Sequence, residues 1–187
     1  MTDYTSDGHI FNKTVTFIGV DPGANGAMSF GKAEWIGGKL KCHKIDSVKC
    51  HSLISGRKSS LSMAANAFKS DECIAYIEKV HAMPHDGRSS LFKFGVNYGA
   101  WLGLLHSESK INKIVEVSPQ KWMKFWQEHY NIKLPKDKRE RKAKLKSMAN
   151  LYSSKTPTTL WNADSILIAQ YGFEQEKERV SESRKDI

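Results

Sequence analysis

The chain of 187 residues has few cysteines, no long apolar run and fewer acidic than basic residues. Cys42, Cys50 and Cys73 are too few and too unevenly spaced for a disulfide framework, which disfavours a small secreted scaffold. No apolar run approaches the roughly 20 residues that a helix needs to cross a bilayer, so we expect no membrane association. The first residues lack a basic segment followed by an apolar one, so we expect a protein of the reducing cytoplasm.

The excess of basic residues is the strongest signal in the composition. Lysine and arginine together number 29, aspartate and glutamate 20, and the formal net charge is +9. Such a field attracts polyanions, so nucleic acid is the expected partner, although a basic protein with no polyanion partner stays an alternative. Much of the excess falls in one stretch, which faces only Asp137 and Glu140: Lys133, Lys136, Lys138, Arg139, Arg141, Lys142, Lys144 and Lys146.

The chain is the size of one compact domain. We expect a flexible leader over residues 1–12, a folded domain over 13–173 and a charged, frayed tail over 174–187. The pattern of residues 14–20 predicts a buried strand. Short antiparallel strands should follow, broken at Gly31 and at the glycine pair 37–38.

The rest of the chain alternates between helical and strand patterns. Residues 59–70 suggest a short helix capped by Ser59 or Ser60, and residues 73–80 a strand. A helix is expected over 90–108 and a strand over 113–117. Ser118 should cap a helix that begins at Pro119, with a basic loop and helix to Tyr152 and a last helix over 162–180. This order predicts an α/β domain with a mixed sheet.

Three carboxylates stand where apolar residues would be expected. Asp21 ends the first strand ahead of a glycine-rich turn, Glu78 lies near the end of a later strand, and Asp164 precedes the apolar run SILIA. If the three meet, they repel one another and raise their own pKa values unless a cation neutralises them. Mg²⁺ prefers oxygen ligands, and two such ions support an in-line phosphodiester displacement. Alternatively, the three acids are unrelated: a turn aspartate, a glutamate paired with lysine, and an aspartate favoured by a helix dipole.

Three segments of the chain, taken in order, carry a resemblance to a known family: IGVDPGANGA, IEKVHAMPHDGRSSLFKFGVNYGAWLG and NADSILIAQYG. In these segments the chain resembles the RuvC family of Holliday-junction resolvases, especially phage-encoded members. The resemblance implies an RNase H-like fold with a mixed central sheet flanked by helices, and a homodimer that nicks four-way junctions. It implies two Mg²⁺ ions, with Mn²⁺ as a substitute, and Asp21, Glu78 and Asp164 as metal ligands. A phage-encoded member would act in the host cytoplasm.

The same resemblance suggests further site residues. Trp161 stands where bacterial members have an additional aspartate, so either Asn162 serves as a neutral ligand or three acids suffice. Lys121 and Lys138 match basic residues near the scissile phosphate and are expected to be catalytic, and His81 falls where an aromatic residue lies near DNA. The full expected DNA-binding set is His81, Arg88, Lys121, Lys136, Lys138, Arg139, Arg141 and Lys142. A nuclease of flaps and forks, or a junction-binding protein that has lost cleavage, are the alternatives.

Four other patterns leave choices open. Gly95, Gly99 and Gly103 share one helical face, which suggests close approach of a partner subunit or of the domain's own sheet. DPGANG also fits the phosphate turn of actin-like ATPases, but those need about twice this length. A zinc site could be drawn through Cys42, His43, Cys50 and His51, although adjacent strand residues point to opposite faces. Trp122, Phe125 and Trp126 form either the core face of a helix or a stacking platform for bases.

Overall fold

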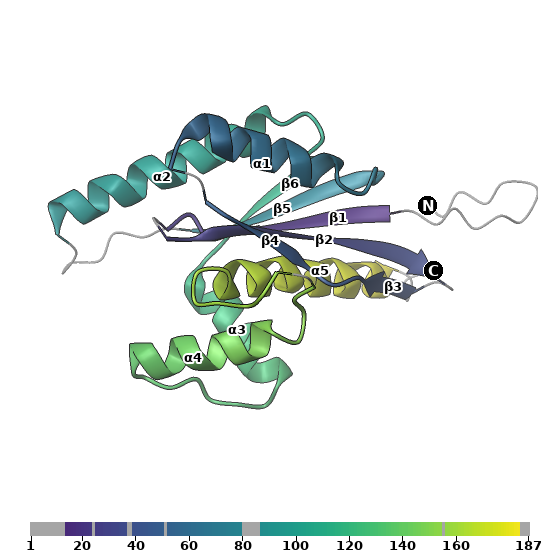
Figure 1. Ribbon diagram of the computed structural model, residues 1–187. Coiled ribbons are helices and arrows are strands. Elements are labelled where there is room, and N and C mark those ends of the chain that lie inside the picture. Colours follow the sequence, from purple (N-terminus) through teal and green to yellow (C-terminus); the bar gives the residue numbers. More distant parts are fainter. Residues whose placement is uncertain are drawn as a thin grey trace, which may run out of the picture.

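The computed structural model describes residues 14–23, 25–36, 39–50, 52–79, 87–154 and 156–183. A mixed sheet lies between two groups of helices (Figure 1). The elements in chain order are β1 (Thr14–Val20), β2 (Ala27–Ile36), β3 (Lys39–Cys42), β4 (Asp46–Lys49), α1 (Ile54–Asn66), β5 (Glu72–Glu78), α2 (Arg88–Ser107), β6 (Lys113–Val117), α3 (Pro119–His129), α4 (Lys138–Ala149) and α5 (Ala163–Ser183). The expected leader, residues 1–12, lies outside the described residues.

The order of the strands brings two of the predicted acids to one edge of the sheet. The order is β3-β2-β1-β5-β6, and β4 also pairs with β2. β1 runs antiparallel to β2 and parallel to β5, with Val20 opposite Ile77. Asp21 and Glu78 each follow one of these paired residues, so the parallel register sets their backbones side by side. The mixed α/β sheet predicted from the sequence is therefore confirmed.

The two faces of the sheet are covered differently (Figure 1). Helices α1 and α2 lie on one face, and α5 crosses the other, with α3 and α4 packed outside it. Each face has its own apolar core: Ile18, Leu61 and Trp101 belong to the first, and Phe17 and Trp126 to the second. None of the helices in the described ranges is long and apolar enough to cross a membrane.

Close contact between β1 and α5 depends on Gly19. A Cβ added at Gly19 would lie 2.3 Å from the backbone oxygen of Ser165 and 2.4 Å from the backbone nitrogen of Ala169. Real Cβ atoms do not approach other atoms so closely, so any side chain here would push α5 off the sheet. This contact fixes the start of α5, and hence Asp164, beside the end of β1.

Local expectations for the first half of the chain were partly wrong. Gly31 does not break the second strand, since β2 continues through it and pairs with β4 before Gly31 and with β3 after it. The space beside Gly31 is filled by Ile45, whose Cγ1 would be 3.0 Å from an added Cβ. Helix α1 begins at Ile54 rather than near Ser59 or Ser60, and its start has no side-chain cap. Arg57 in its first turn is buried, donates to the Asn97 side chain and lies over the Trp101 ring, which holds this end of the helix against α2.

The second half of the chain follows its predictions more closely. The side chain of Ser118 accepts a hydrogen bond from the backbone of Lys121, and Pro119 is the first residue of α3, as expected. Asp137 caps α4 in the same way. The last helix, expected over residues 162–180, is α5 at Ala163–Ser183, so the helix continues into the charged tail expected from residue 174. Glu176 explains this continuation: it is 5% exposed and accepts hydrogen bonds from Tyr76, Lys113 and Arg179.

Candidate active site

Asp21, Glu78 and Asp164 meet at the edge of the sheet where β1 and β5 end. The Asp21 carboxylate accepts a hydrogen bond from the backbone of Gly23 at 2.9 Å, which holds it in the turn after β1. Glu78 ends β5, and its Oε1 accepts a hydrogen bond from Trp122 Nε1 at 3.2 Å. Asp164 lies in the first turn of α5. Two strands and one helix thus supply the three acids.

Burial and repulsion raise the pKa values of Asp21 and Glu78. Burial, together with the charge of Asp164, raises the pKa of Asp21 to about 6. Burial, with the charges of Asp21 and Asp164, raises the pKa of Glu78 to about 8. The charge of Asp164 therefore acts on both of the other carboxylates. Such repulsion is expected of acids gathered without enough positive charge to neutralise them.

Lys142 of α4 supplies part of that positive charge. Its Nζ lies 3.1 Å from Asp164 Oδ2 and donates a hydrogen bond to it. Partial burial lowers the pKa of Lys142, but Asp164, Asp21 and Glu78 raise it more, so the net pKa lies above its ordinary value. The ammonium is therefore charged and belongs to the carboxylate group. The sequence predicted Lys142 as one of many DNA-binding residues and assigned the catalytic position to Lys138, one turn earlier.

The three acids do not form a ready metal cage in this conformation. Among the described residues, no group of three histidine, cysteine, aspartate or glutamate side chains is arranged to hold a metal ion. The contacts above give the reason: Asp164 is bound to Lys142, Glu78 to Trp122, and Asp21 to its own turn. The oxygen donors suit a hard cation, but their present positions do not converge on one point.

Asn162 does not join the acids as the sequence predicted. Its Oδ1 accepts hydrogen bonds from the backbone and hydroxyl of Thr159, and its Nδ2 donates to the carbonyl of Pro157. The residue is 0% exposed. Both polar atoms of the amide are thus used to shape the segment before α5. In this conformation the amide oxygen, the atom that a cation would need, is bonded to Thr159, and the role of neutral ligand stays a prediction.

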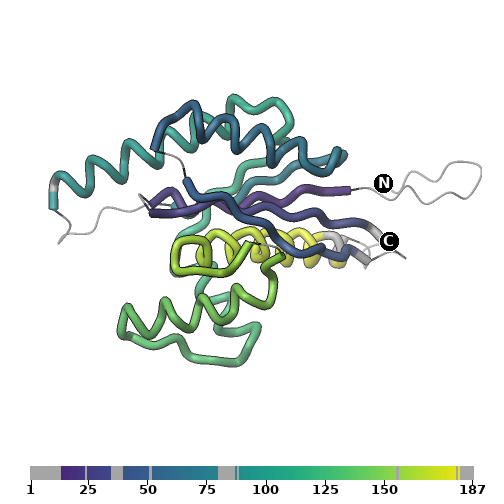
Figure 2. Tube along the Cα trace, viewed as in Figure 1, coloured from purple at the N-terminus to yellow at the C-terminus, as the bar shows by residue number. Residues whose placement is uncertain are grey.

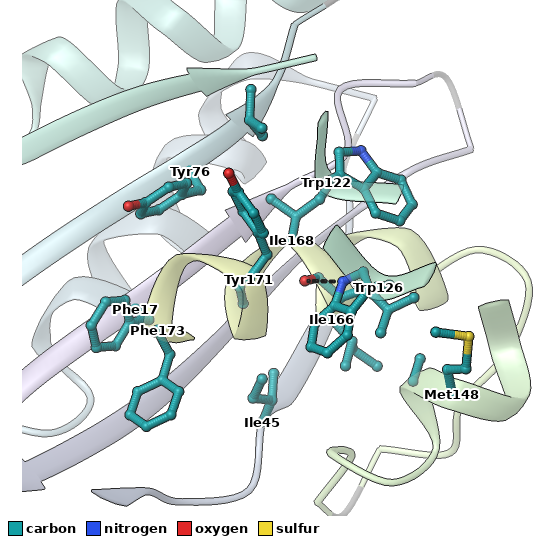
Figure 3. Close-up of a cluster of buried hydrophobic side chains, with 14 of the residues drawn as sticks. Phe17, Ile45, Tyr76, Trp122, Trp126, Met148, Ile166, Ile168, Tyr171 and Phe173 are labelled. Atoms are coloured by element: carbon teal, nitrogen blue, oxygen red, sulfur yellow. Dashed lines mark hydrogen bonds between the residues drawn. The ribbon is translucent and has the colours of Figure 1, made fainter. Parts of the chain in front are cut away.

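The tryptophans of α3 belong to the core (Figure 3). Trp122 is 1% exposed and Trp126 is 0% exposed, and Phe125 packs against the same cluster. Trp126 Nε1 donates to the backbone oxygen of Leu167, which ties α3 to α5. The core interpretation is therefore confirmed over the stacking platform. The contact of Trp122 with Glu78 was missed, since no local pattern links two residues on different elements.

The predicted DNA-binding residues are mostly exposed around α3 and α4. Lys121, Lys136, Lys138 and Arg139 are exposed. Arg141 has a structural contact: its guanidinium donates to the carbonyls of Pro135 and Lys136. Arg88 is the first residue of α2, and His81 lies outside the described residues.

The candidate zinc ligands have separate partners. The thiol of Cys42 donates to the carbonyl of His43, and the thiol of Cys50 donates to the carbonyl of Asp21. Burial raises the pKa of both thiols to about 12, which disfavours the thiolate that zinc needs. His43 pairs with Glu34 at 3.2 Å. His51 lies outside the described residues.

The glycine face of α2 is open. A Cβ added at Gly95, Gly99 or Gly103 would have no heavy atom within 4 Å. The expected alternative of tight packing on the domain's own sheet is therefore wrong for these positions. Large apolar side chains on the same helix are also exposed, at 74% for Phe92 and 53% for Val96.

Comparison with known proteins gives a fold but no family assignment. No family model matches the chain, and no curated protein matches it. Among solved structures, RuvC of T. thermophilus in complex with Holliday junction substrate has a TM-score of 0.53 and 16% sequence identity, over 87% of this chain and 95% of that one. Another Thermus thermophilus RuvC structure has a TM-score of 0.50 and 16% identity, over 88% and 97%. The chain therefore has the RNase H-like fold, and the resemblance to RuvC is confirmed as a likeness of fold.

Proposed function

We propose that this protein is a metal-dependent endonuclease that resolves four-way DNA junctions or related branched DNA. The observation that carries the proposal is the meeting of Asp21, Glu78 and Asp164 beside Lys142 at one edge of the sheet. Such a group of acids on a strongly basic domain suits hydrolysis of a nucleic-acid backbone. The RuvC of T. thermophilus, which shares the fold, was solved with a Holliday junction substrate.

The donor set fits a hard divalent cation by its chemistry. All three side chains offer oxygen, the ligand atom that a hard cation prefers. Burial, with repulsion between the acids, raises the pKa values of Asp21 and Glu78, and a bound cation would offset both effects. We assign Asp21, Glu78 and Asp164 as the residues that would hold Mg²⁺, or Mn²⁺ in its place. Two bound ions would supply the charge that stabilises the displacement at phosphorus.

Lys142 has two tasks in this proposal. Before DNA arrives, its ammonium neutralises part of the carboxylate charge and holds Asp164 at the start of α5. If Asp164 held a cation instead, the ammonium would be free to contact the scissile phosphate, on which a lysine acts as a point charge. Trp122 holds Glu78 toward the group throughout, since the indole N–H donates to its carboxylate.

The remaining predicted residues form the DNA surface of the proposal. Four exposed basic residues would contact phosphates away from the cut: Lys121, which precedes the Trp122 that binds Glu78, Lys138 and Arg139 on α4, and Lys136 just before α4. His81 and Arg88, which follow Glu78 in the chain, are proposed to contact the DNA strand on the Glu78 side of the site. Each neutralised phosphate releases counterions, so junction affinity should fall steeply as salt rises.

A homodimer through α2 is the proposed assembly. Gly95, Gly99 and Gly103 leave room for the backbone of a second copy, and Phe92 and Val96 provide exposed apolar area beside them. A two-fold dimer would present two equivalent carboxylate groups, as paired cuts in a four-way junction require.

Cleavage of labelled DNA tests the function. The protein should nick a four-way junction with Mg²⁺ or Mn²⁺, leaving a 5′-phosphate and a 3′-hydroxyl. Glu78→Gln and Asp21→Asn should each lower the rate on the order of 10³-fold or more while junction binding remains. Glu128→Gln is the matched control, because Glu128 is exposed on α3 and pairs only loosely with Lys124.

The other outcomes identify the alternatives. Equal cutting of flaps, forks and junctions would favour a structure-selective nuclease. Tight junction binding by the unaltered protein without cleavage in either metal would favour a junction-binding protein that has lost cleavage. Cleavage retained by Asp21→Asn would refute the assigned site.

A further inference from the structure

An open groove of about 660 Å³ lies between α4 and the segment that leads into α5. One wall is a face of α4 with the spacing i, i+3, i+4, i+7, and the other belongs to the segment before Asn162. The lining residues are Ala143, Lys146, Ser147, Asn150, Thr158 and Leu160. Among the described residues that line the groove there is no acid, and Lys146 supplies the charge. An anionic or neutral polar ligand suits this lining better than a cation.

The wall that faces α4 is held in place before any ligand binds. Asn162 bonds to Thr159 and to the carbonyl of Pro157, while the hydroxyl of Thr156 donates to the carbonyl of Ser47. These contacts fix the segment on both sides of Thr158. A preformed wall lowers the entropy cost of binding, because little has to be ordered when the ligand arrives.

Two features of the lining suit a flat ligand with a polar edge. Leu160 is 55% exposed, so it offers an apolar surface beside polar groups. On the facing helix, Asn150 has a side-chain amide that can both donate and accept, and Ser147 has a hydroxyl. Thr158 is 8% exposed, and its hydroxyl has no hydrogen-bond partner among the described residues. A nucleobase combines apolar faces with donors and acceptors at its rim.

The groove adjoins the carboxylate group at both walls. On α4, Lys146 lies one turn, about 5.4 Å, beyond Lys142, which binds Asp164. On the other wall, Leu160 precedes Asp164 by one turn of chain. Figure 2 shows α4 running beside the first part of α5, with the connecting segment folded back over it. A DNA strand with a phosphate at Asp164 would therefore carry its neighbouring nucleotide past this groove.

We infer that the groove binds one unpaired nucleotide of the cleaved strand, adjacent to the scissile phosphate. The base lies against Leu160 with its edge toward Asn150 and Ser147, and Lys146 contacts the next phosphate. This inference rests on the proposed nuclease function and adds a subsite that selects strands with an unstacked base at the branch point. Unstacking is cheapest where bases are already unpaired, so the groove favours branched DNA over duplex.

A fluorescent base analogue tests the inference without requiring cleavage. Junctions carry 2-aminopurine at one position at a time around the crossover, and emission is followed on binding to the full-length Asp21→Asn protein in Ca²⁺. One position should change its emission on binding. Adding Leu160→Ala should abolish that change, whereas Leu151→Ala should not, because Leu151 is exposed to a similar degree, at 59%, and does not line the groove.

Cleavage kinetics of the protein without Asp21→Asn give the second measurement. Leu160→Ala or Asn150→Ala should lower kcat/KM roughly 5- to 100-fold, the range expected for loss of one base contact. An abasic site at the position found with 2-aminopurine should remove most of that difference. Lys146→Ala should lower kcat/KM more than Lys144→Ala, which removes the same charge from an exposed residue outside the groove.

The outcomes separate this inference from the proposed function. If emission is unchanged by Leu160→Ala, or if the abasic junction is as sensitive to Leu160→Ala as the intact one, the nucleotide subsite is refuted while cleavage stands. If the emission change depends on Leu160 but the unaltered protein never cuts, the nuclease proposal fails and the subsite stands.

Discussion

The two faces of the sheet differ in what they do with their polar and small residues. On the α5 face, Gly19 is in tight contact with α5, Glu176 is fully bonded, and Asn162 has no free polar atom. On the α2 face, a Cβ added at Gly95, Gly99 or Gly103 would meet no atom of the described residues within 4 Å, and Phe92 is exposed. The α5 face therefore positions the carboxylates, whereas the α2 face keeps a surface free for another molecule.

The largest effect should come from adding a methyl group at a glycine on each face of the sheet. Gly19→Ala should destabilise the protein by about 3 kcal/mol or more, because the new methyl would overlap the backbone of α5. Gly99→Ala should be neutral or stabilise the helix by up to about 1 kcal/mol. Chemical denaturation of both variants measures the difference. Equal losses in the two variants would contradict the assignment of close contact to one face only.

The carboxylates should make stability depend on pH in the absence of divalent metal. Folding raises the pKa values of Asp21 and Glu78 to about 6 and about 8, so the folded state binds protons more tightly than the unfolded state. Their stabilising contribution is present below about pH 4 and is lost as pH rises toward about 8, by on the order of 1–3 kcal/mol. The unfolding free energy is measured against pH for the unaltered protein and for Asp21→Asn.

The Asp21→Asn variant is the control for other groups that titrate between about pH 4 and pH 8. The difference between the two curves should shrink when Mg²⁺ is added, because a cation would favour the charged acids. A difference that stays constant between pH 4 and pH 8 would show that Asp21 keeps its ordinary pKa.

The open surface of α2 should control assembly. Phe92→Glu with Val96→Glu should weaken self-association at least 10-fold, since charges would be buried in the apolar contact. Sedimentation equilibrium gives the dissociation constant of the unaltered protein and of the double variant. A chain that is monomeric without substitution at high micromolar concentration would exclude the proposed dimer.

The smallest effect concerns the contact between Trp122 and Glu78. Trp122→Phe keeps most of the buried ring and removes the N–H that donates to the carboxylate, so stability should fall by about 1 kcal/mol. The pKa of Glu78 should rise further, and a higher Mg²⁺ concentration should be needed for half-maximal cleavage. An unchanged metal requirement would assign Trp122 to packing alone.

Local patterns in the sequence were enough for much of the fold. The strand at residues 14–20, the cap at Ser118 and the helix after Pro119 follow from burial and hydrogen-bonding preferences that act within a few residues. The same preferences misplaced the start of α1. In α5, contacts of Glu176 with Tyr76 and Lys113, which lie far away in the chain, tie the polar second half of the helix to the sheet.

Buried acids, a basic helix and glycines that permit close approach can all be identified in the sequence. The packing of the helices on the sheet sets the rest: Lys142 rather than Lys138 reaches Asp164, Trp122 holds Glu78, and Asn162 turns inward. The cause is distance along the chain. Which side chains meet depends on where α5 crosses β1 and how α4 packs on α5, and no short stretch of sequence encodes these crossings.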